Sequence, residues 1–479
     1  MARARLLLAS NRGPLSFVLD DAGTLSAKRG GGGLVSGLSA LSSADDFVWV
    51  CAALCDADRE AARRAPDGRL DRAGHDTDGT RLRMLEIDPQ TFHRAYNVVA
   101  NSTLWFVHHL LFATPTAPSF DAAFRREWSS YETYNLAFAR ALADDAEPGA
   151  KVLVQDYHLT LAPRLLRRLR PDLRIAHFSH TPWAPAEYYR MLPGDVARDV
   201  LLGVLGADHA GFLSPRWAAA FLDCCEAVLS ADVDREKGTV SYDGHTTRVA
   251  VHALGVDADG LRERAHRPDV DGRLTTLRGQ VGNRRTLVRV DRTELSKNIV
   301  RGLQAYRELL RTRPEWCGRV VHVAFAYPSR HDLPEYREYT AAVQRVASEI
   351  VEEFGTAEWQ PVILNVHDDY ARSLAAYRMA DVLLVNPVRD GMNLVAKEGP
   401  LLAENGCAVV LSTEAGAAVE MGQDALLVNP YDVSATAEAI HTALCMPADE
   451  RRARAQRLAG VSSACPPAKW LADQIAALD

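Results

Sequence analysis

Short runs of β-branched residues and leucine alternate with longer amphipathic segments along almost the whole chain. The runs have the length of buried strands, and the segments between them repeat apolar residues at helical spacing. This alternation is typical of βαβ units around parallel sheets. A first series of expected strands lies at Arg5–Ala9, Phe47–Cys51, Val152–Gln155, Ile175–Ser179, His209–Phe212 and Arg248–Ala253. A second series lies at Thr286–Val290, Val320–Phe325, Val362–Asn365, Val382–Asn386, Ala408–Ser412 and Ala425–Val428.

The two series predict two domains. The first series ends near Gly255, and the polar segment Leu261–Arg285 separates it from the second. We therefore expect an α/β protein with two doubly wound, Rossmann-like domains, residues 1–255 and 256–479. In open parallel sheets, ligands bind beyond the carboxyl ends of the strands. A binding site in a cleft between the two domains is the resulting expectation.

Composition narrows the classes of function. Of 479 residues, 47% are hydrophobic and 24% charged, as in ordinary globular proteins. The 62 acidic and 55 basic residues give a net charge of -7, so we expect no nucleic-acid partner. The apolar run Leu6–Ala9 is too short for a signal peptide, and no run reaches the length of a membrane span. We expect a cytoplasmic protein without membrane contact, and the sequence leaves a homo-oligomer open.

Metal and cofactor signals are missing from the sequence. The eight cysteines form neither a disulfide framework nor the paired spacing of a zinc site. We therefore expect no metal and no cofactor.

Two glycine-containing segments suit anions. Gly30–Gly33 follows the first strand region, and its amide groups could approach an anion without obstruction by Cβ atoms, although glycine runs also form plain hairpins. Asp390–Leu394 stands between an expected strand and an expected helix, whose amino end offers free N–H groups to a diphosphate. Glu398 within that helix could hold two ribose hydroxyls. The alternative is a capped surface helix.

Polar residues follow several expected strands directly. Arg292 and Lys297 lie at the end of one strand, where two cations would neutralise a departing diphosphate; a solvated basic turn has the same spacing. Asp156 and His180 end two neighbouring strands of the first series. Strand ends of this kind often carry site residues, although a lone histidine is more often structural.

Taken in order, these residues resemble the motifs of the trehalose-6-phosphate synthase family. The matching pieces, which span nearly the full chain, are Asn11-Arg12, Gly30–Gly33, Tyr96-Asn97, Leu104-Trp105, Gln155–His158, His180–Trp183, Arg292–Lys297, Pro328–Arg330, Arg389–Glu398 and Asn429–Asp432. The resemblance implies a metal-independent, retaining glucosyltransferase with the two-domain GT-B fold. It would transfer glucose from a nucleotide-glucose to glucose 6-phosphate, giving trehalose 6-phosphate. The amino-terminal domain would bind the acceptor and the carboxy-terminal domain the nucleotide sugar.

The resemblance also implies a role for each matching residue on the donor side. Those expected to hold the diphosphate are Arg292, Lys297 and the amides of Asn393 and Leu394. Glu398 would hold the ribose. Those expected to fix the donor glucose are Asp390, Gly391, Met392 and His180. The loop containing Gly31 and Gly32 would close over the donor.

On the acceptor side the resemblance implies a phosphate pocket. Its expected members are Arg12, Tyr96, Trp105 and Arg330, and two guanidinium groups suit a phosphate dianion. Asp156 would orient the acceptor sugar. The chain departs from the family pattern next to Lys297: Asn298 stands where the family has a glycine after the lysine.

The nucleobase is the least constrained part of the donor. Asp368 and Asp369 lie where the resemblance places the base, and a carboxylate can accept both N–H donors on the edge of guanine while it repels the carbonyls of uracil. This reasoning favours GDP-glucose over UDP-glucose. The alternative is that the two carboxylates cap a helix beginning near Tyr370.

Two other functions stay open at this point. A pseudo-glycosyltransferase that couples a nucleotide-activated cyclitol to an aminocyclitol phosphate would use the same scaffold. A non-catalytic subunit that binds sugar phosphate as a regulator would retain the phosphate pocket, although the intact Arg292, Lys297 and Glu398 argue against it.

Overall fold

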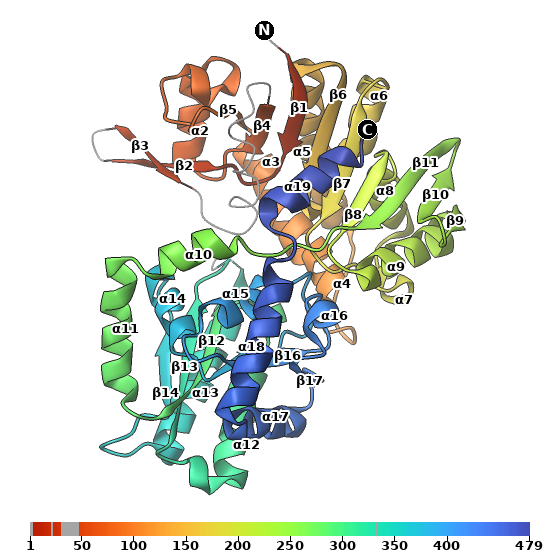
Figure 1. Ribbon diagram of the computed structural model, residues 1–479. Helices are drawn as coiled ribbons and strands as arrows, with labels where there is room; N and C mark the ends of the chain where they lie inside the picture. Colours follow the sequence, from red (N-terminus) through yellow and green to blue (C-terminus); the bar gives the residue numbers. More distant parts are fainter. Residues whose placement is uncertain (1–2, 21–22, 30–46, 331–332) are drawn as a thin grey trace. The chain divides into compact units, whose positions relative to one another are not determined.

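The structure is a computed structural model that describes residues 3–20, 23–29, 47–330 and 333–479 (Figure 1). Its contacts divide the chain into two compact units, Met1–Leu254 with Pro467–Asp479, and Gly255–Pro466. The sequence predicts a second domain that runs to residue 479, but the last segment packs with the first unit. The reason is apolar burial: the ring of Trp470 is fully buried and meets Phe178 edge-on at 4.9 Å.

The first unit contains eleven strands among its described residues. They are β1 (Ala4–Ala9), β2 (Leu15–Leu19), β3 (Leu25–Arg29), β4 (Phe47–Ala52), β5 (Arg81–Leu85), β6 (Ala146–Gln155), β7 (Arg174–Ser179), β8 (His209–Phe212), β9 (Asp232–Asp234), β10 (Thr239–Tyr242) and β11 (His245–Val251). Its main helices are α2 (Asp56–Arg64), α3 (Pro89–His93), the π-helix η4 (Arg94–Leu104), α4 (Trp105–His109), α5 (Ala122–Asp145), α6 (Ala162–Leu169), α7 (Ala186–Tyr189), α8 (Gly194–Val204), α9 (Pro215–Cys224) and α19 (Pro467–Ala476).

The main sheet of the first unit has the order β5-β4-β1-β6-β7-β8-β11-β10-β9. It is parallel from β5 to β11, and β10 then pairs antiparallel with both β11 and β9. Successive parallel strands move away from β1 on one side and away from β6 on the other. The topological switch point of this sheet, where such folds bind ligands, is therefore the gap between the carboxyl ends of β1 and β6.

The second unit is a smaller βα series. Its strands are β12 (Arg285–Arg292), β13 (Val320–Tyr327), β14 (Val362–Asn365), β15 (Val382–Val385), β16 (Ala408–Ser412) and β17 (Leu426–Val428). Its main helices are α10 (Ala258–Ala265), α11 (Pro268–Val281), α12 (Ile299–Thr312), α13 (Pro334–Phe354), α14 (Tyr370–Arg378), α15 (Leu394–Leu402), α16 (Ala418–Met421), α17 (Val433–Cys445) and α18 (Ala448–Ser463).

The sheet of the second unit is fully parallel, in the order β14-β13-β12-β15-β16-β17. This is the order of a dinucleotide-binding sheet, and its switch point lies between β12 and β15. Helix α12 packs against α13 and α17, whereas α14 and α15 pack with α10, α11 and α18. Every residue of β13 and β15 is buried, as expected for strands covered by helices on both faces.

The polar segment Leu261–Arg285, which separates the two strand series in the sequence, is mostly helical. Most of it forms α10 and α11. Pro268 stands at the first position of α11, where its missing N–H costs no hydrogen bond, and Leu274 and Leu277 are buried. A narrow apolar stripe on an otherwise charged helix is sufficient to dock it against α14.

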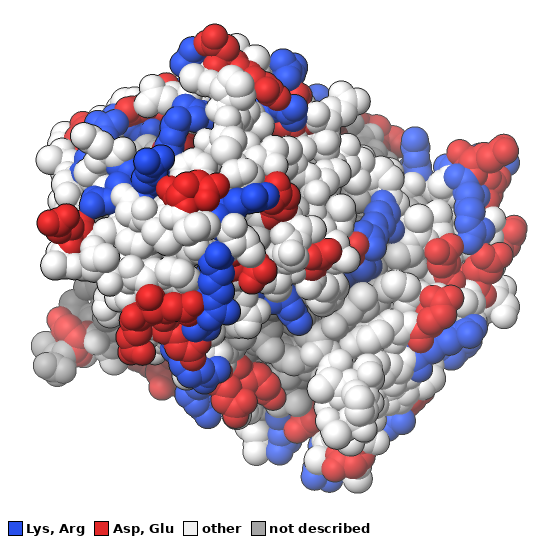
Figure 2. Space-filling view, turned by 90° about the horizontal axis from the view of Figure 1, so that it is seen from below, with Lys and Arg blue, Asp and Glu red and all other residues white. Residues whose placement is uncertain are grey.

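The surface is charged but mixed. In the face displayed in Figure 2, basic and acidic side chains are interspersed rather than gathered by sign. Oppositely charged side chains on the surface form ion pairs, such as Arg311 with Glu353 at 2.7 Å. No helix within the described residues is both long and apolar enough to cross a membrane.

Candidate active site

In the second unit, the predicted donor residues converge on the switch point. Lys297 follows β12 and Asp390 follows β15, and the Lys297 Nζ lies 2.6 Å from Asp390 Oδ2. The same oxygen accepts a hydrogen bond of 3.0 Å from Asn393 Nδ2. Burial alone would lower the pKa of Lys297, but Asp390, Asp291 and Glu294 raise it above its ordinary value. A permanent cation therefore stands at the edge where this sheet type binds phosphates.

Helix α15 begins at the same place. Asn393 adopts a left-handed conformation (φ 75°) and caps the helix, accepting a hydrogen bond from the Ala396 amide at 3.3 Å. The amides of the first turn, including that of Leu394, have no acceptor within the helix. An anion placed there would gain both these donors and the positive end of the helix dipole.

The loop before α15 is held rigidly by its neighbour. Gly416 N donates to Asp390 O at 3.1 Å, and Ala417 N donates to Met392 O at 2.9 Å. A Cβ atom on Gly416 would lie 1.9 Å from the carbonyl oxygen of Gly391, so only glycine fits there. The loop Asp390–Met392 is thus preorganised without any ligand.

Glu398 lies one turn into α15 and is partly buried. Burial raises its pKa to about 7, and a hydrogen bond with Tyr377 opposes that rise only in part. A carboxylate in this environment gains from hydroxyl donors, because each hydrogen bond to the charged form offsets its desolvation. Its chemistry fits the predicted contact with a ribose.

Asn298 replaces the glycine of the family pattern without loss of the turn. Its φ is 59°, a left-handed conformation that asparagine tolerates better than most residues. Its Nδ2 donates to Asn386 O at 2.9 Å and to Pro430 O at 2.7 Å. The substitution therefore ties Lys297 to the ends of β15 and β17.

Two arginines predicted for different anions share one carboxylate. Arg292 Nη2 lies 3.0 Å from Glu294 Oε1, and Arg330 Nη1 lies 3.9 Å from Glu294 Oε2. Arg330 also donates to Tyr336 OH at 2.6 Å. The Arg292 side chain is 60% exposed, whereas that of Arg330 is 14% exposed. In the sequence, Glu294 is only one of the residues between Arg292 and Lys297, and nothing there indicates that it pairs with Arg292 and Arg330.

In the first unit, the predicted residues again lie at the carboxyl ends of strands. Arg12 follows β1 and is exposed. Its main chain is held in place by Ser10, whose Oγ donates to the Arg12 carbonyl oxygen at 2.8 Å. Trp49 Nε1 donates to Ser10 Oγ at 2.7 Å, and Tyr134 OH donates to Asn11 Oδ1 at 2.5 Å.

Asp156, at the end of β6, has an unusual backbone. Its φ of 72° and ψ of 172° fall in a region that is almost restricted to glycine and costs about 1–3 kcal/mol. The His180 amide donates to Asp156 Oδ1 at 3.1 Å, and His158 Nδ1 lies 4.0 Å from Oδ2. Strain retained at a strand end beside the switch point is characteristic of a functional residue.

His180, at the end of β7, is held as a neutral ring. Burial, and secondarily the nearby His177, lowers its pKa to about 3. Its Nε2 lies 2.9 Å from Gln155 Oε1, an acceptor, which places the proton on Nε2. The other nitrogen, Nδ1, is then the acceptor of the ring.

Tyr96 lies in the π-helix η4, and Trp105 is the first residue of α4, which follows η4 without a break. Tyr96 stacks on His158 with ring centroids 5.5 Å apart, and Trp105 lies 5.6 Å from Tyr157. Both therefore line the turn that follows Asp156. π-Helical turns recur at functional sites because they displace side chains from the regular helical positions.

Two residues expected to contact the nucleobase, Asp368 and Asp369, lie at the amino end of α14. Asp369 caps α14, accepting the Arg372 amide on Oδ1 at 3.0 Å, and its Oδ2 lies 2.9 Å from Arg273 Nε. Both oxygens already have partners within the fold, and Asp369 forms the helix cap that the alternative interpretation expects. Asp368 is exposed beside it. Gly31 and Gly32 lie outside the described residues.

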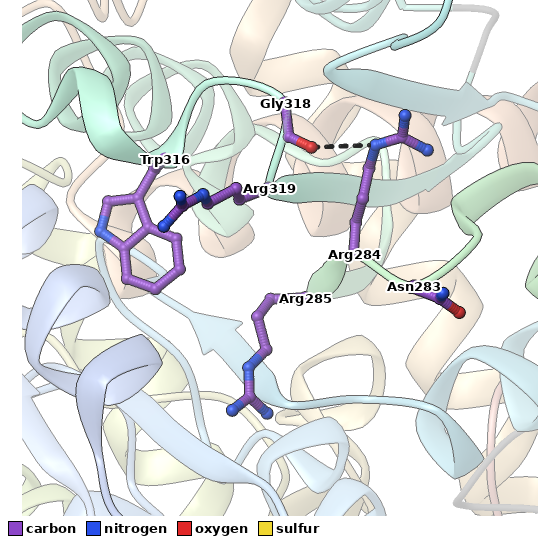
Figure 3. A pocket seen from close by; sticks show the side chains of 6 residues that line it. All are labelled: Asn283, Arg284, Arg285, Trp316, Gly318 and Arg319. Carbon is purple, nitrogen blue, oxygen red and sulfur yellow. Dashed lines mark hydrogen bonds between the residues drawn. The ribbon is translucent and has the colours of Figure 1, made fainter.

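A hollow of about 530 Å³ in the second unit lies where β12 and β13 begin, at the opposite edge of the sheet. It is lined by Asn283, Arg284, Arg285, Trp316, Gly318 and Arg319 (Figure 3). Arg284 donates to the carbonyl oxygens of Val281, Gly318 and Glu358, and Arg285 pairs with Asp381 at 2.6 Å. These two guanidinium groups serve the fold, so the hollow is not the candidate site.

Comparisons with known proteins identify the family of the chain. The chain matches the family model of glycosyltransferase family 20 over residues 4–479. It is 32% identical over 460 residues to the alpha,alpha-trehalose-phosphate synthase [UDP-forming] of Schizosaccharomyces pombe, covering 95% of this chain and 86% of the relative.

Solved structures are similar over the full length. An alpha,alpha-trehalose-phosphate synthase (UDP-forming) from Burkholderia vietnamiensis is 31% identical, with a TM-score of 0.83 and 99% of each chain covered. A trehalose-6-phosphate protein from E. coli bound with UDP-2-fluoro glucose is 27% identical, with a TM-score of 0.84 and the same coverage. The expected GT-B fold and the resemblance to trehalose-6-phosphate synthase are confirmed. The chain belongs to glycosyltransferase family 20, and it is a glycosyltransferase.

Proposed function

We propose that this glycosyltransferase is an α,α-trehalose-phosphate synthase that transfers glucose from UDP-glucose to glucose 6-phosphate, with retention of configuration. The observation that carries the proposal is the group formed by Lys297, Asp390 and Asn393 at the amino end of α15. It offers a cation, free amides and an oriented carboxylate to one sugar diphosphate. The names of the relatives support the same reaction.

Different residues bind the diphosphate, the ribose and the glucose of the donor. Lys297 and Arg292 neutralise the diphosphate together with the first amides of α15, and Glu398 accepts the ribose hydroxyls. Asp390 and the amides of Gly391 and Met392 fix the glucose, with His180 as a neutral hydrogen-bonding partner. Asp390 has a second effect, because its pairing holds the Lys297 ammonium in place.

The acceptor roles fall to the remaining residues. Arg12, Tyr96, Trp105 and Arg330 bind the phosphate of glucose 6-phosphate, and Asp156 orients its sugar. The bond between the donor anomeric carbon and the diphosphate breaks, and the acceptor oxygen bonds to that carbon on the same face. The acceptor proton passes to the departing phosphate oxygen. Stabilisation of the diphosphate charge by Lys297 and Arg292 supplies much of the rate.

The proposed donor is UDP-glucose, not the GDP-glucose that the sequence reasoning on Asp368 and Asp369 favours. That reasoning required free carboxylates at Asp368 and Asp369, and Asp369 is committed to Arg372 and Arg273. The similar proteins from Schizosaccharomyces pombe and Burkholderia vietnamiensis are named as UDP-forming. Neither the cyclitol reaction nor a non-catalytic role gains support from them.

A panel of donors tests this choice. With glucose 6-phosphate as acceptor, we expect a higher kcat/KM for UDP-glucose than for GDP-glucose. Asp369→Asn should leave that ratio unchanged and change stability little, because asparagine caps a helix about as well as aspartate does. Asp368→Asn is the matched exposed variant and should change neither quantity. A clear preference for GDP-glucose that disappears in Asp369→Asn would overturn this assignment.

Glu398 gives the donor site a pH dependence. Only the carboxylate accepts two hydroxyls, and its pKa is about 7 in the free protein, so protonation at lower pH should weaken donor binding. We expect the Kd of UDP-glucose, measured without acceptor, to be about tenfold higher at pH 6 than at pH 8. Glu398→Gln should bind weakly and show a flat profile. An equal slope in wild type and Glu398→Gln would contradict the ribose contact.

A further inference from the structure

Glu294 occupies an unusual position between two residues of the proposed donor site. It follows Arg292 and precedes Lys297 in the turn after β12, and its side chain is completely buried. Its amide donates to Arg292 O at 2.7 Å, and its carbonyl oxygen accepts the Lys297 amide at 2.9 Å. The main chain therefore fixes the point from which the carboxylate extends.

The two carboxylate oxygens contact different partners. Oε1 lies 3.0 Å from Arg292 Nη2 and accepts a hydrogen bond of 3.1 Å from Ser329 Oγ. Oε2 is buried, has no hydrogen-bond partner among the described residues, and lies 3.9 Å from Arg330 Nη1. One carboxylate thus touches an arginine assigned to the donor diphosphate and lies beside an arginine assigned to the acceptor phosphate.

Glu294 is ionised at every pH at which the protein would be assayed. Burial would raise its pKa, but the cations Arg292, Arg330 and Lys297 together lower it to about 2. A buried carboxylate with one good contact and one longer contact responds strongly to the loss of either cation.

We infer that Glu294 is a positioning residue that links the two phosphate sites, because its carboxylate is the shared counter-ion of Arg292 and Arg330. The inference rests on the proposed function, which assigns Arg292 to the donor and Arg330 to the acceptor. A diphosphate that binds Arg292 competes with Glu294 for the guanidinium group. Arg330 makes that competition easier, since it compensates the carboxylate when Arg292 turns to the ligand.

Removal of Arg330 should therefore weaken the binding of UDP. Without Arg330, Glu294 holds Arg292 more tightly, and UDP must disrupt a stronger pair. Arg330 therefore assists the binding of a ligand that it does not touch. A purely long-range attraction between Arg330 and UDP would also favour binding, but it would not depend on Glu294.

A double-mutant cycle separates the two explanations. We would titrate UDP alone into wild type, Arg330→Ala, Glu294→Gln and the double variant by calorimetry. Arg330→Ala should weaken UDP about fivefold in the wild-type background and by less than about twofold in the Glu294→Gln background. Equal factors in the two backgrounds would overturn the link. Failure of wild type to bind UDP would instead overturn the proposed donor.

Controls distinguish this link from general damage. Glu404 also holds two arginines, Arg378 at 2.7 Å and Arg278 at 2.6 Å, and has no assigned role in the site. In the Glu404→Gln background, the fivefold effect of Arg330→Ala should persist. If Glu294→Gln does not fold, the cycle of Arg292→Ala with Arg330→Ala carries the test. Non-additive losses of UDP affinity support the link, and additive losses contradict it.

Discussion

Lys297→Met should lower kcat on the order of 10²–10³-fold, while the KM for glucose 6-phosphate changes little. The ammonium lies 2.6 Å from Asp390 and stays protonated, so it is positioned before the substrate arrives. Charge on the departing diphosphate grows mainly in the transition state, and an interaction made there lowers kcat when it is removed. Steady-state kinetics with both substrates varied would measure the two parameters.

The matched control is Lys151→Met. Lys151 also pairs with a carboxylate, that of Asp479, but it lies in the middle of β6 (Ala146–Gln155) rather than after the carboxyl end of that strand. This variant should keep kcat near the wild-type value. If Lys297→Met raised only the KM for glucose 6-phosphate, Lys297 would belong to the acceptor site instead.

Arg330→Ala should raise the KM for glucose 6-phosphate by about 10- to 150-fold, which corresponds to the loss of a charge-assisted contact worth about 1.5–3 kcal/mol. Its guanidinium group is largely buried and is held by Tyr336, so it is positioned before the substrate arrives. The loss should be larger than the accompanying effect on the donor, because the acceptor phosphate contacts Arg330 directly.

Unphosphorylated glucose provides the control for this variant. At saturating UDP-glucose, any slow transfer to glucose should proceed at the same rate in wild type and Arg330→Ala, since this acceptor has no phosphate for Arg330 to contact. A similar loss with both acceptors would place Arg330 outside the phosphate pocket.

Much of the fold follows from the hydrophobic pattern alone. Buried strands such as β15 and β16 are largely apolar runs, and their alternation with amphipathic segments indicates parallel sheets. The antiparallel edge formed by β9 and β10 was not predicted, because its short strands are partly exposed and carry few apolar residues. The placement of α19 depends on which surface buries Trp470, a tertiary property with no local signal.

The candidate site was predictable where its chemistry follows from strand order. Lys297 and Asp390 come soon after the adjacent parallel strands β12 and β15, which brings them to one edge of that sheet. Asp156 directly follows β6 in the other sheet. Glu294 and Asp369 were not predictable in the same way. Whether a carboxylate meets a ligand, a buried arginine or a helix cap depends on side chains distant in sequence, such as Arg330 and Arg273.

The most direct measurement is the release of UDP from UDP-glucose by the purified protein, with and without glucose 6-phosphate, together with identification of the sugar product. We expect release to depend on glucose 6-phosphate and the product to be trehalose 6-phosphate with both anomeric centres in the α configuration. Equal release of UDP with unphosphorylated glucose, or a product other than trehalose 6-phosphate, would contradict the proposed function.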